Sequence, residues 1–188
     1  NTFYSASYLN YFDDTHFGYL GYERGQLGVG IRYFYSGSMK KIDAFEYEYG
    51  TFGVHHIDAS VGKGFVFNDI GVGVALKLVY GTIDTLNAFG LGLDIGAMHE
   101  LMDPGIMLGL SVKNLGFGLK SYIDSQEMFP YEITLSGVKH FDAGWVGIDL
   151  VKPALFGFGA RLGGAYYINP IIHLKASYST LLSDISSE

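Results

Sequence analysis

The chain of 188 residues contains no cysteine, which excludes disulfide frameworks, thiolate nucleophiles and zinc sites built on cysteine. Basic charge is scarce, because the formal net charge is −7 and the longest basic run is Lys40-Lys41. A nucleic-acid partner is therefore not expected, since phosphate binding needs a basic surface. No stretch approaches about 18 consecutive apolar residues without a charge or a glycine pair, so no transmembrane helix is predicted. The first residues also lack the basic n-region of a signal peptide.

Glycine and aromatic residues are abundant in this chain. It has 27 glycines, roughly twice the average share, together with 15 tyrosines and 14 phenylalanines. Charged residues make up only 16% of the chain, against about 25% in ordinary soluble domains. Because 48% of the residues are hydrophobic, intrinsic disorder is excluded. The chain is either unusually apolar for a protein in water or does not lie in water.

Bulky apolar residues alternate with small ones along most of the chain. Between Asp69 and Tyr80 every even position is bulky, whereas the odd positions include Gly71, Gly73 and Ala75. A helix would need apolar residues at three- and four-residue spacing, so this pattern predicts strands. About eleven antiparallel strands are predicted in a single domain over residues 1–188, at about 3–12, 17–24, 27–35, 57–62, 69–80, 88–98, 106–112, 132–139, 146–150, 156–163 and 172–178. Turns are expected at 68–69, 103–105, 142–144 and 169–170, and irregular stretches at about 36–50 and 116–130.

The second face of these strands favours a membrane barrel over a soluble sandwich. A soluble sheet exposes a face rich in Lys, Glu and Thr, whereas this face consists mostly of Gly, Ser and Ala. The mid-strand charges all fall on that small-residue face: Arg32, Lys77, Asp94, Asp149 and Arg161. In a membrane barrel the bulky face contacts lipid and the polar face lines the lumen, with tyrosines such as Tyr33 and Tyr35 near the strand ends. The predicted fold class is therefore all-β, an antiparallel transmembrane β-barrel.

Several segments resemble one known family by their order and spacing. They are Tyr8–Tyr11, Phe17–Tyr19, Gly50–Phe52, Asp58, Val74–Lys77, Ala88–Gly96 and Gly109–Gly116. Together they resemble the PorV/PorQ family of outer-membrane barrels, which is related in fold to the FadL fatty-acid transporters, and the opening resembles the PorQ branch.

The resemblance implies a FadL-like barrel of about fourteen strands in a bacterial outer membrane, with an accessory or protein-binding part in type IX protein secretion. Bacterial single-chain barrels have an even number of strands. Either the count of eleven is off, or residues 1–188 lack strands at the N- and C-terminal ends.

Polar residues suggest a lumen but no reaction centre. Lys77, Asp94 and Lys113 lie on the small-residue face of three consecutive predicted strands, so they form either a polar track for a ligand or an interior salt-bridge ladder. His56 and Asp58 share a face, whereas adjacent His55 points to the other side, and no third metal ligand is identifiable.

Asp13-Asp14-Thr15-His16 has the residue types of a surface-protease site but also those of a plain turn. No catalytic residue, metal or cofactor is predicted, and the protein is not expected to be an enzyme.

Recognition by loops is the predicted function. The stretch 36–50 is a candidate partner loop with five charged residues, Lys40, Lys41, Asp43, Glu46 and Glu48. The expected partners are outer-membrane lipid and other secretion-machinery or cell-surface proteins, and lipid or detergent could also be bound. The alternatives are a FadL-like transporter, which the charged small-residue face fits poorly, a porin for small solutes, and a soluble sandwich.

Overall fold

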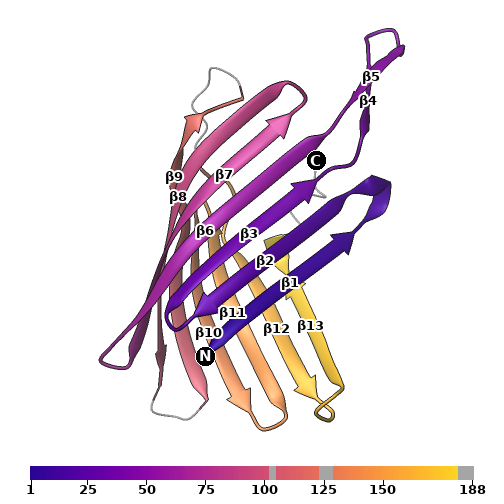
Figure 1. Cartoon of the computed structure of the whole chain (residues 1–188). Helices are drawn as coiled ribbons and strands as arrows, with labels where there is room; N and C mark the ends of the chain where they lie inside the picture. The colour runs from indigo at the N-terminus through magenta and orange to yellow at the C-terminus, as the bar shows by residue number, and fades with distance from the viewer. Residues whose placement is uncertain (102–104, 123–128, 182–188) are drawn as a thin grey trace. The chain divides into compact units, whose positions relative to one another are not determined.

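Eleven strands form one antiparallel sheet, and two further strands form a separate hairpin (Figure 1). The structure, a computed structural model, describes residues 1–101, 105–122 and 129–181. The strands are β1 (Thr2–Asn10), β2 (His16–Arg24), β3 (Leu27–Tyr35), β4 (Met39–Ile42), β5 (Glu48–Phe52), β6 (Val54–Phe67), β7 (Ile70–Ile83), β8 (Leu86–Glu100), β9 (Ile106–Lys120), β10 (Glu132–Phe141), β11 (Gly144–Pro153), β12 (Gly159–Tyr167) and β13 (His173–Ser179). The sheet order follows the chain, β1-β2-β3-β6-β7-β8-β9-β10-β11-β12-β13. The prediction of an all-β fold with eleven antiparallel strands in the sheet is confirmed.

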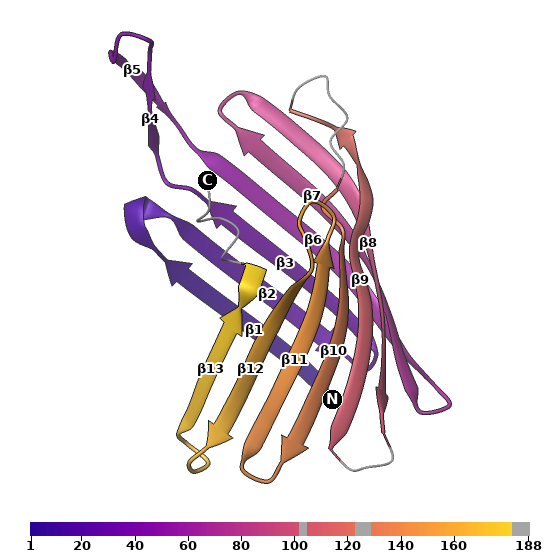
Figure 2. The same cartoon turned by 180° about the vertical axis from the view of Figure 1, so that it is seen from behind.

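The chain divides into two compact units. The first comprises Asn1–Gly64, Val74–Leu93 and Gly116–Phe129, and the second comprises Phe65–Gly73, Asp94–Leu115 and Pro130–Glu188. In the first unit β1, β2, β3 and β6 are neighbours, and the β4–β5 hairpin extends past the ends of β3 and β6 (Figure 1). In the second unit β10 to β13 run side by side (Figure 2).

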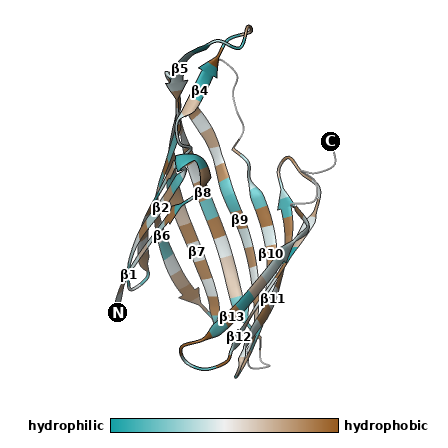
Figure 3. Ribbon diagram, turned by 90° about the vertical axis from the view of Figure 1, so that its right-hand side faces the viewer, coloured by the Kyte–Doolittle hydropathy of each residue, from teal (hydrophilic) through white to brown (hydrophobic). Residues whose placement is uncertain are grey.

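Most bulky residues of the strands are exposed, and the others, such as Leu91 in β8, are half-buried. In β7 the alternate residues that are exposed are Ile70, Val72, Val74, Leu76, Leu78 and Tyr80. The same banding of apolar and polar residues is visible along the strands in Figure 3. Among the described residues, only Val151 and Ala165 are buried hydrophobic side chains. The strands therefore have an alternating pattern without an apolar core beneath it.

The predicted turns are confirmed where the structure describes them. Asn68 and Asp69 join β6 to β7 with φ angles of 47° and 66°, the left-handed pair that a tight hairpin turn needs. The turns at 142–144 and 169–170 join β10 to β11 and β12 to β13. Of the turn predicted at 103–105, residues 103 and 104 lie outside the described residues.

The two stretches predicted to be irregular are partly strand. Residues 39–52 form the β4–β5 hairpin, which the alternation rule misses because charged and aromatic residues lie on both of its faces. The second stretch was predicted to begin at 116, but β9 continues to Lys120, and residues 123–128 lie outside the described part.

The reason that the pattern in β9 is hard to read is Asn114. Before it the exposed bulky residues are even-numbered, as at Leu108 and Leu110, whereas after it they are odd-numbered, as at Leu115 and Phe117. Asn114 has a φ of 57°, and an extra left-handed residue of this kind is typical of a β-bulge. The bulge changes the phase and keeps the bulky residues on one face.

After this change of phase, Gly116 lies where β8 approaches. A Cβ at Gly116 would overlap the carbonyl oxygen of Leu91, which is backbone and cannot swing away. We expect Gly116→Ala to lower the free energy of unfolding by about 1–3 kcal/mol through overpacking. Gly109→Ala in the same strand is the control, because its Cβ would meet Ser136 Cβ at an ordinary 3.6 Å. Urea unfolding followed by the fluorescence of Trp145 measures both, and equal midpoints would contradict the close approach.

Candidate functional site

A first polar cluster lies on the small-residue face of the first unit. Arg32 in β3 is directly opposite Asp58 in β6, and Arg32 Nη2 lies 3.1 Å from Asp58 Oδ2. His56 Nε2 lies 3.0 Å from Asp58 Oδ1, and Lys77 in β7 also attracts this carboxylate electrostatically. Asp58 is the most enclosed of the three paired side chains, with 18% of its side chain exposed. The predicted His56–Asp58 face is confirmed, with Arg32 as the further partner.

His55 points away from this cluster, as predicted for adjacent strand residues. Its Nδ1 is hydrogen-bonded to the Tyr33 hydroxyl at 2.9 Å, and its ring stacks on Tyr35 at a centroid distance of 4.6 Å. Tyr35 in turn stacks on His16, and His16 on Tyr8, so four rings form a row across β1, β2, β3 and β6. We call Tyr8, His16, Tyr35 and His55 the ring row.

The ring row is also hydrogen-bonded to a polar residue of the first turn. The Tyr8 hydroxyl is 2.7 Å from His16 Nδ1, and His16 Nε2 is 3.1 Å from Asp14 Oδ1. Asp13 and Asp14 lie in a short 3₁₀ turn, Phe12–Asp14, as the turn interpretation expects. The sequence places Tyr33 and Tyr35 near a strand end and includes Tyr8 and His16 in other motifs, but it does not indicate that their rings stack, because that depends on strand register.

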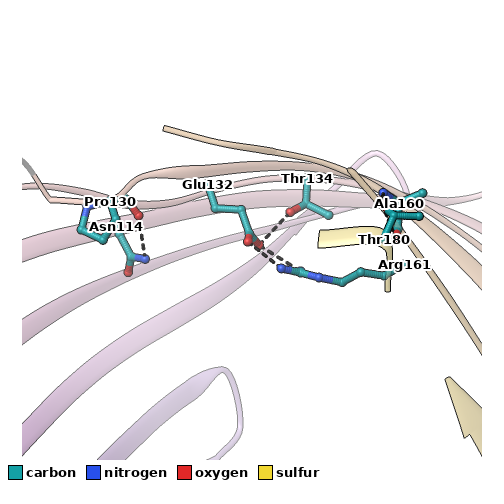
Figure 4. Close-up of polar contacts among 7 residues, drawn as sticks. All are labelled: Asn114, Pro130, Glu132, Thr134, Ala160, Arg161 and Thr180. Atoms are coloured by element: carbon teal, nitrogen blue, oxygen red, sulfur yellow. Dashed lines mark hydrogen bonds and ion pairs between the residues drawn. The ribbon is translucent and has the colours of Figure 1, made fainter. Parts of the chain in front are cut away.

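A second polar cluster lies in the second unit (Figure 4). The Arg161 guanidinium of β12 donates to both carboxylate oxygens of Glu132 in β10, at 3.1 Å and 2.7 Å. The Thr134 hydroxyl donates to Glu132 Oε1 at 3.1 Å. Lys113 is opposite Glu132 in the register, and Asp149 is opposite Arg161. Three predicted lumen-facing residues are therefore gathered around Glu132.

Glu132 was not singled out from the sequence. It begins a run in which Thr134 and Ser136 share its face while Ile133 and Leu135 occupy the other. A polar alternation of this kind, in a strand predicted to lie near others with charges on the same face, is the sequence signal that indicates Glu132.

Asp94 and Lys77 complete the set of predicted lumen-facing residues. Asp94 Oδ1 accepts a hydrogen bond of 2.8 Å from the Asn114 backbone, which holds the bulge of β9. Lys77 belongs to the first unit, whereas Asp94 and Lys113 belong to the second, so the proposed track of the three stays a prediction. In the first unit the charges alternate in sign from strand to strand, as in the salt-bridge interpretation, whereas in the second unit the acidic Glu132 and Asp149 lie on adjacent strands.

Glycines on the small-residue face leave room for larger side chains, as the sequence predicted. A Cβ at Gly90 would overlap the ring of Phe129, and one at Gly81 would overlap the Tyr122 hydroxyl. Phe129 and Tyr122 both belong to the connection between β9 and β10. These contacts with glycines of β7 and β8 could not be predicted from the sequence, because each aromatic residue is far from its glycine along the chain.

The predicted partner-loop residues form an ordered hairpin. Lys40 Nζ is 2.6 Å from Glu48 Oε1, and Lys41 pairs with Asp84 in the turn between β7 and β8. Asp43 Oδ1 accepts hydrogen bonds from the backbone N–H groups of Phe45 and Tyr47, at 2.8 Å and 2.9 Å. Glu46 lies at the tip with a φ of 64°. All five predicted charges thus lie on one hydrogen-bonded hairpin.

Comparison of the chain with known protein families, curated proteins and solved structures gives no match. Within the described ranges, no helix has the length and apolar character needed to span a membrane.

The two-pronged contact between Arg161 and Glu132 predicts a measurable loss on truncation. Arg161→Ala removes two charge-assisted hydrogen bonds, and we expect the free energy of unfolding to fall by about 1–2 kcal/mol, since the pair is partly exposed. Arg24→Ala is the matched control, because Arg24 makes no ion pair with any residue the structure describes. Urea unfolding midpoints compare the two. The assignment is wrong if Glu132→Ala and Arg161→Ala have strictly additive effects in the double variant.

Proposed function

We propose that this chain belongs to a β-barrel of the bacterial outer membrane that acts without catalysis as a protein-recognition scaffold. The PorV/PorQ resemblance supports a more specific form of the proposal, an accessory component of type IX protein secretion. The observation that carries it is the exposure of the bulky rows, which fit lipid, while the mid-strand charges lie on the opposite face in pairs.

The exposed rows fit a bilayer better than water. Leu76 is 60% exposed and lies within a continuous row on β7, and extended apolar patches of this kind are rare on soluble monomers. The long strands β6 to β9 have 14, 14, 15 and 15 residues, and a transmembrane strand needs about 9–11. Outward-facing lysines lie near strand ends, as at Lys139, which pairs with the first residue of β9. There a long side chain can reach the membrane surface.

Barrel closure is part of the proposal. Among the described strands, β1 and β13 each have one hydrogen-bonded neighbour in the sheet order. An open strand edge is not tolerated in hydrocarbon, because its backbone groups would have no hydrogen-bond partners. Pairing of these two strands, directly or through further strands, would satisfy them and accord with the fourteen strands that the resemblance implies.

The ends of the strands differ in a way that supports an orientation. The connections 36–53 and 121–131 follow β3 and β9 at one end, whereas the opposite end has turns such as 25–26, 68–69 and 142–143. Outer-membrane barrels have short periplasmic turns and longer external loops. The hairpin would therefore project outside the cell, and the ring row would lie at the membrane surface, where aromatic side chains gather.

The proposal predicts that charge is tolerated on one face of β7 and not on the other. Leu76→Lys places a cation on the lipid face, at a cost of about 2–4 kcal/mol at mid-membrane, and should reduce the amount of folded protein in outer-membrane fractions severalfold. Gly73→Lys is the matched control, since a side chain there enters open space on the small-residue face. Carbonate washing followed by quantification in the membrane pellet measures both. Equal recovery of the two variants, or release of the native protein without detergent, would contradict membrane insertion.

The secretion role is tested separately in a deletion strain of the source bacterium. We expect cargo proteins with a C-terminal sorting domain to accumulate in the periplasm and to be exported again when the full gene is restored. Normal cargo export, combined with solute conductance or bound fatty acid in the purified protein, would instead favour the transporter or porin alternative.

A further inference from the structure

The tip of the β4–β5 hairpin carries acidic charge that the hairpin itself does not neutralise. Its two lysines are already paired, Lys40 with Glu48 and Lys41 with Asp84. Glu46 makes no side-chain hydrogen bond or ion pair with any described residue. The Asp43 carboxylate accepts backbone hydrogen bonds through one oxygen, Oδ1, and has no lysine or arginine partner in the described part of the chain. The tip is therefore locally anionic in a protein whose formal net charge is −7.

Large aromatic side chains lie close to these carboxylates along the hairpin sequence. Phe45 is 81% exposed, Tyr47 72% and Tyr49 68%. Side chains of this size bury a large area when a partner covers them, and Tyr is among the residues that contribute most to binding at interfaces. Three exposed aromatic residues at alternate positions of one short hairpin are therefore suited to recognition.

Hydrogen bonds and an ion pair within the first unit fasten this surface at its tip and at its base. Asp43 caps the turn through the N–H groups of Phe45 and Tyr47, and Asp43 N donates to Tyr47 O at 3.1 Å. At its base, Lys41 is bound to Asp84, whose backbone N–H lies 3.4 Å from the Gly53 carbonyl oxygen. A surface ordered before binding loses less conformational entropy when a partner docks.

We propose that this tip is a docking site for a protein whose surface carries lysine or arginine around an apolar pocket. Phe45 and Tyr47 fill the pocket, and Glu46 and Asp43 pair with its basic rim. The inference rests on the proposed function in one respect, because it requires the hairpin to lie outside the membrane. A lipid surface is the less suitable partner, since the carboxylates would face the anionic headgroups.

Photo-crosslinking in the source bacterium tests the proposal with the full-length protein. Benzoylphenylalanine replaces Phe45 in one strain and Tyr49 in a second, so that one strain keeps each aromatic residue. The control position is Phe158, which is 84% exposed in the connection between β11 and β12. We expect a protein adduct at 45 or 49 that is absent at 158, and mass spectrometry then identifies the partner and its basic surface.

Charge reversal tests the electrostatic part. Glu46→Lys introduces like charge opposite a basic rim and should reduce the adduct at position 49 at least about tenfold, the equivalent of about 1.4 kcal/mol. Asp142→Lys, in the turn between β10 and β11, is the matched control and should leave the adduct unchanged. In washed membranes, raising the salt concentration from about 0.05 M to 0.5 M should also weaken the adduct, because exposed charges are then screened.

The outcomes separate this inference from the proposed function. If the protein is in the membrane pellet but positions 45 and 49 give no protein adduct, or only lipid adducts, the docking proposal is overturned and the membrane proposal stands. An adduct that survives Glu46→Lys would overturn the basic-rim assignment. If the protein never enters the membrane pellet, the proposed function fails first, and the docking proposal falls with it.

Discussion

A single constraint underlies this structure: bulky apolar side chains alternate with small ones, and most of the bulky rows are left largely uncovered by other parts of the described chain. Only Val151 and Ala165 are buried hydrophobic residues there. Backbone hydrogen bonds between strands can define such a sheet, but they do not supply an apolar core. The surroundings of the bulky rows must then supply the apolar environment, which is why a bilayer is the physically consistent setting that we propose.

The distribution of charge follows from the same constraint. In the apolar surroundings that we propose, a charge in the middle of a strand would have to avoid the bulky face, and the mid-strand charges lie on the small-residue face, where an opposite charge is within reach. Arg32 meets Asp58 in one unit and Arg161 meets Glu132 in the other. Glycines leave space on this face for long or aromatic side chains, as the close contact of the Phe129 ring with Gly90 illustrates. The ion pairs, and the glycines that make room for larger side chains, are thus two consequences of the alternation between bulky and small residues.

The ring row, at the ends of four strands, and the β4–β5 hairpin differ in character from the middle of the strands. The ring row combines tyrosine and histidine, which have apolar bodies and polar edges suited to a boundary between two media. The β4–β5 hairpin instead exposes aromatic residues and carboxylates together, and its ion pairs leave the negative charge at the tip. The strands follow one repeated pattern, whereas the hairpin and the ring row do not. In such an architecture the residues that bind a partner can change without disturbing the fold.

Local sequence determined the strands, most turns and the face of each mid-strand charge, because alternation with period two and turn residues such as Asn68-Asp69 are local properties of the backbone. It did not determine which charges meet. The contact of Arg161 with Glu132 joins residues that lie in different strands, and the ring row needs the register of four strands to align. The bulge at Asn114 was not predicted, because it interrupts the alternation of bulky and small residues. The β4–β5 hairpin was expected to be irregular, because neither of its faces is buried. Only tertiary structure decides such contacts, because they depend on strand pairing between residues that are distant in the chain.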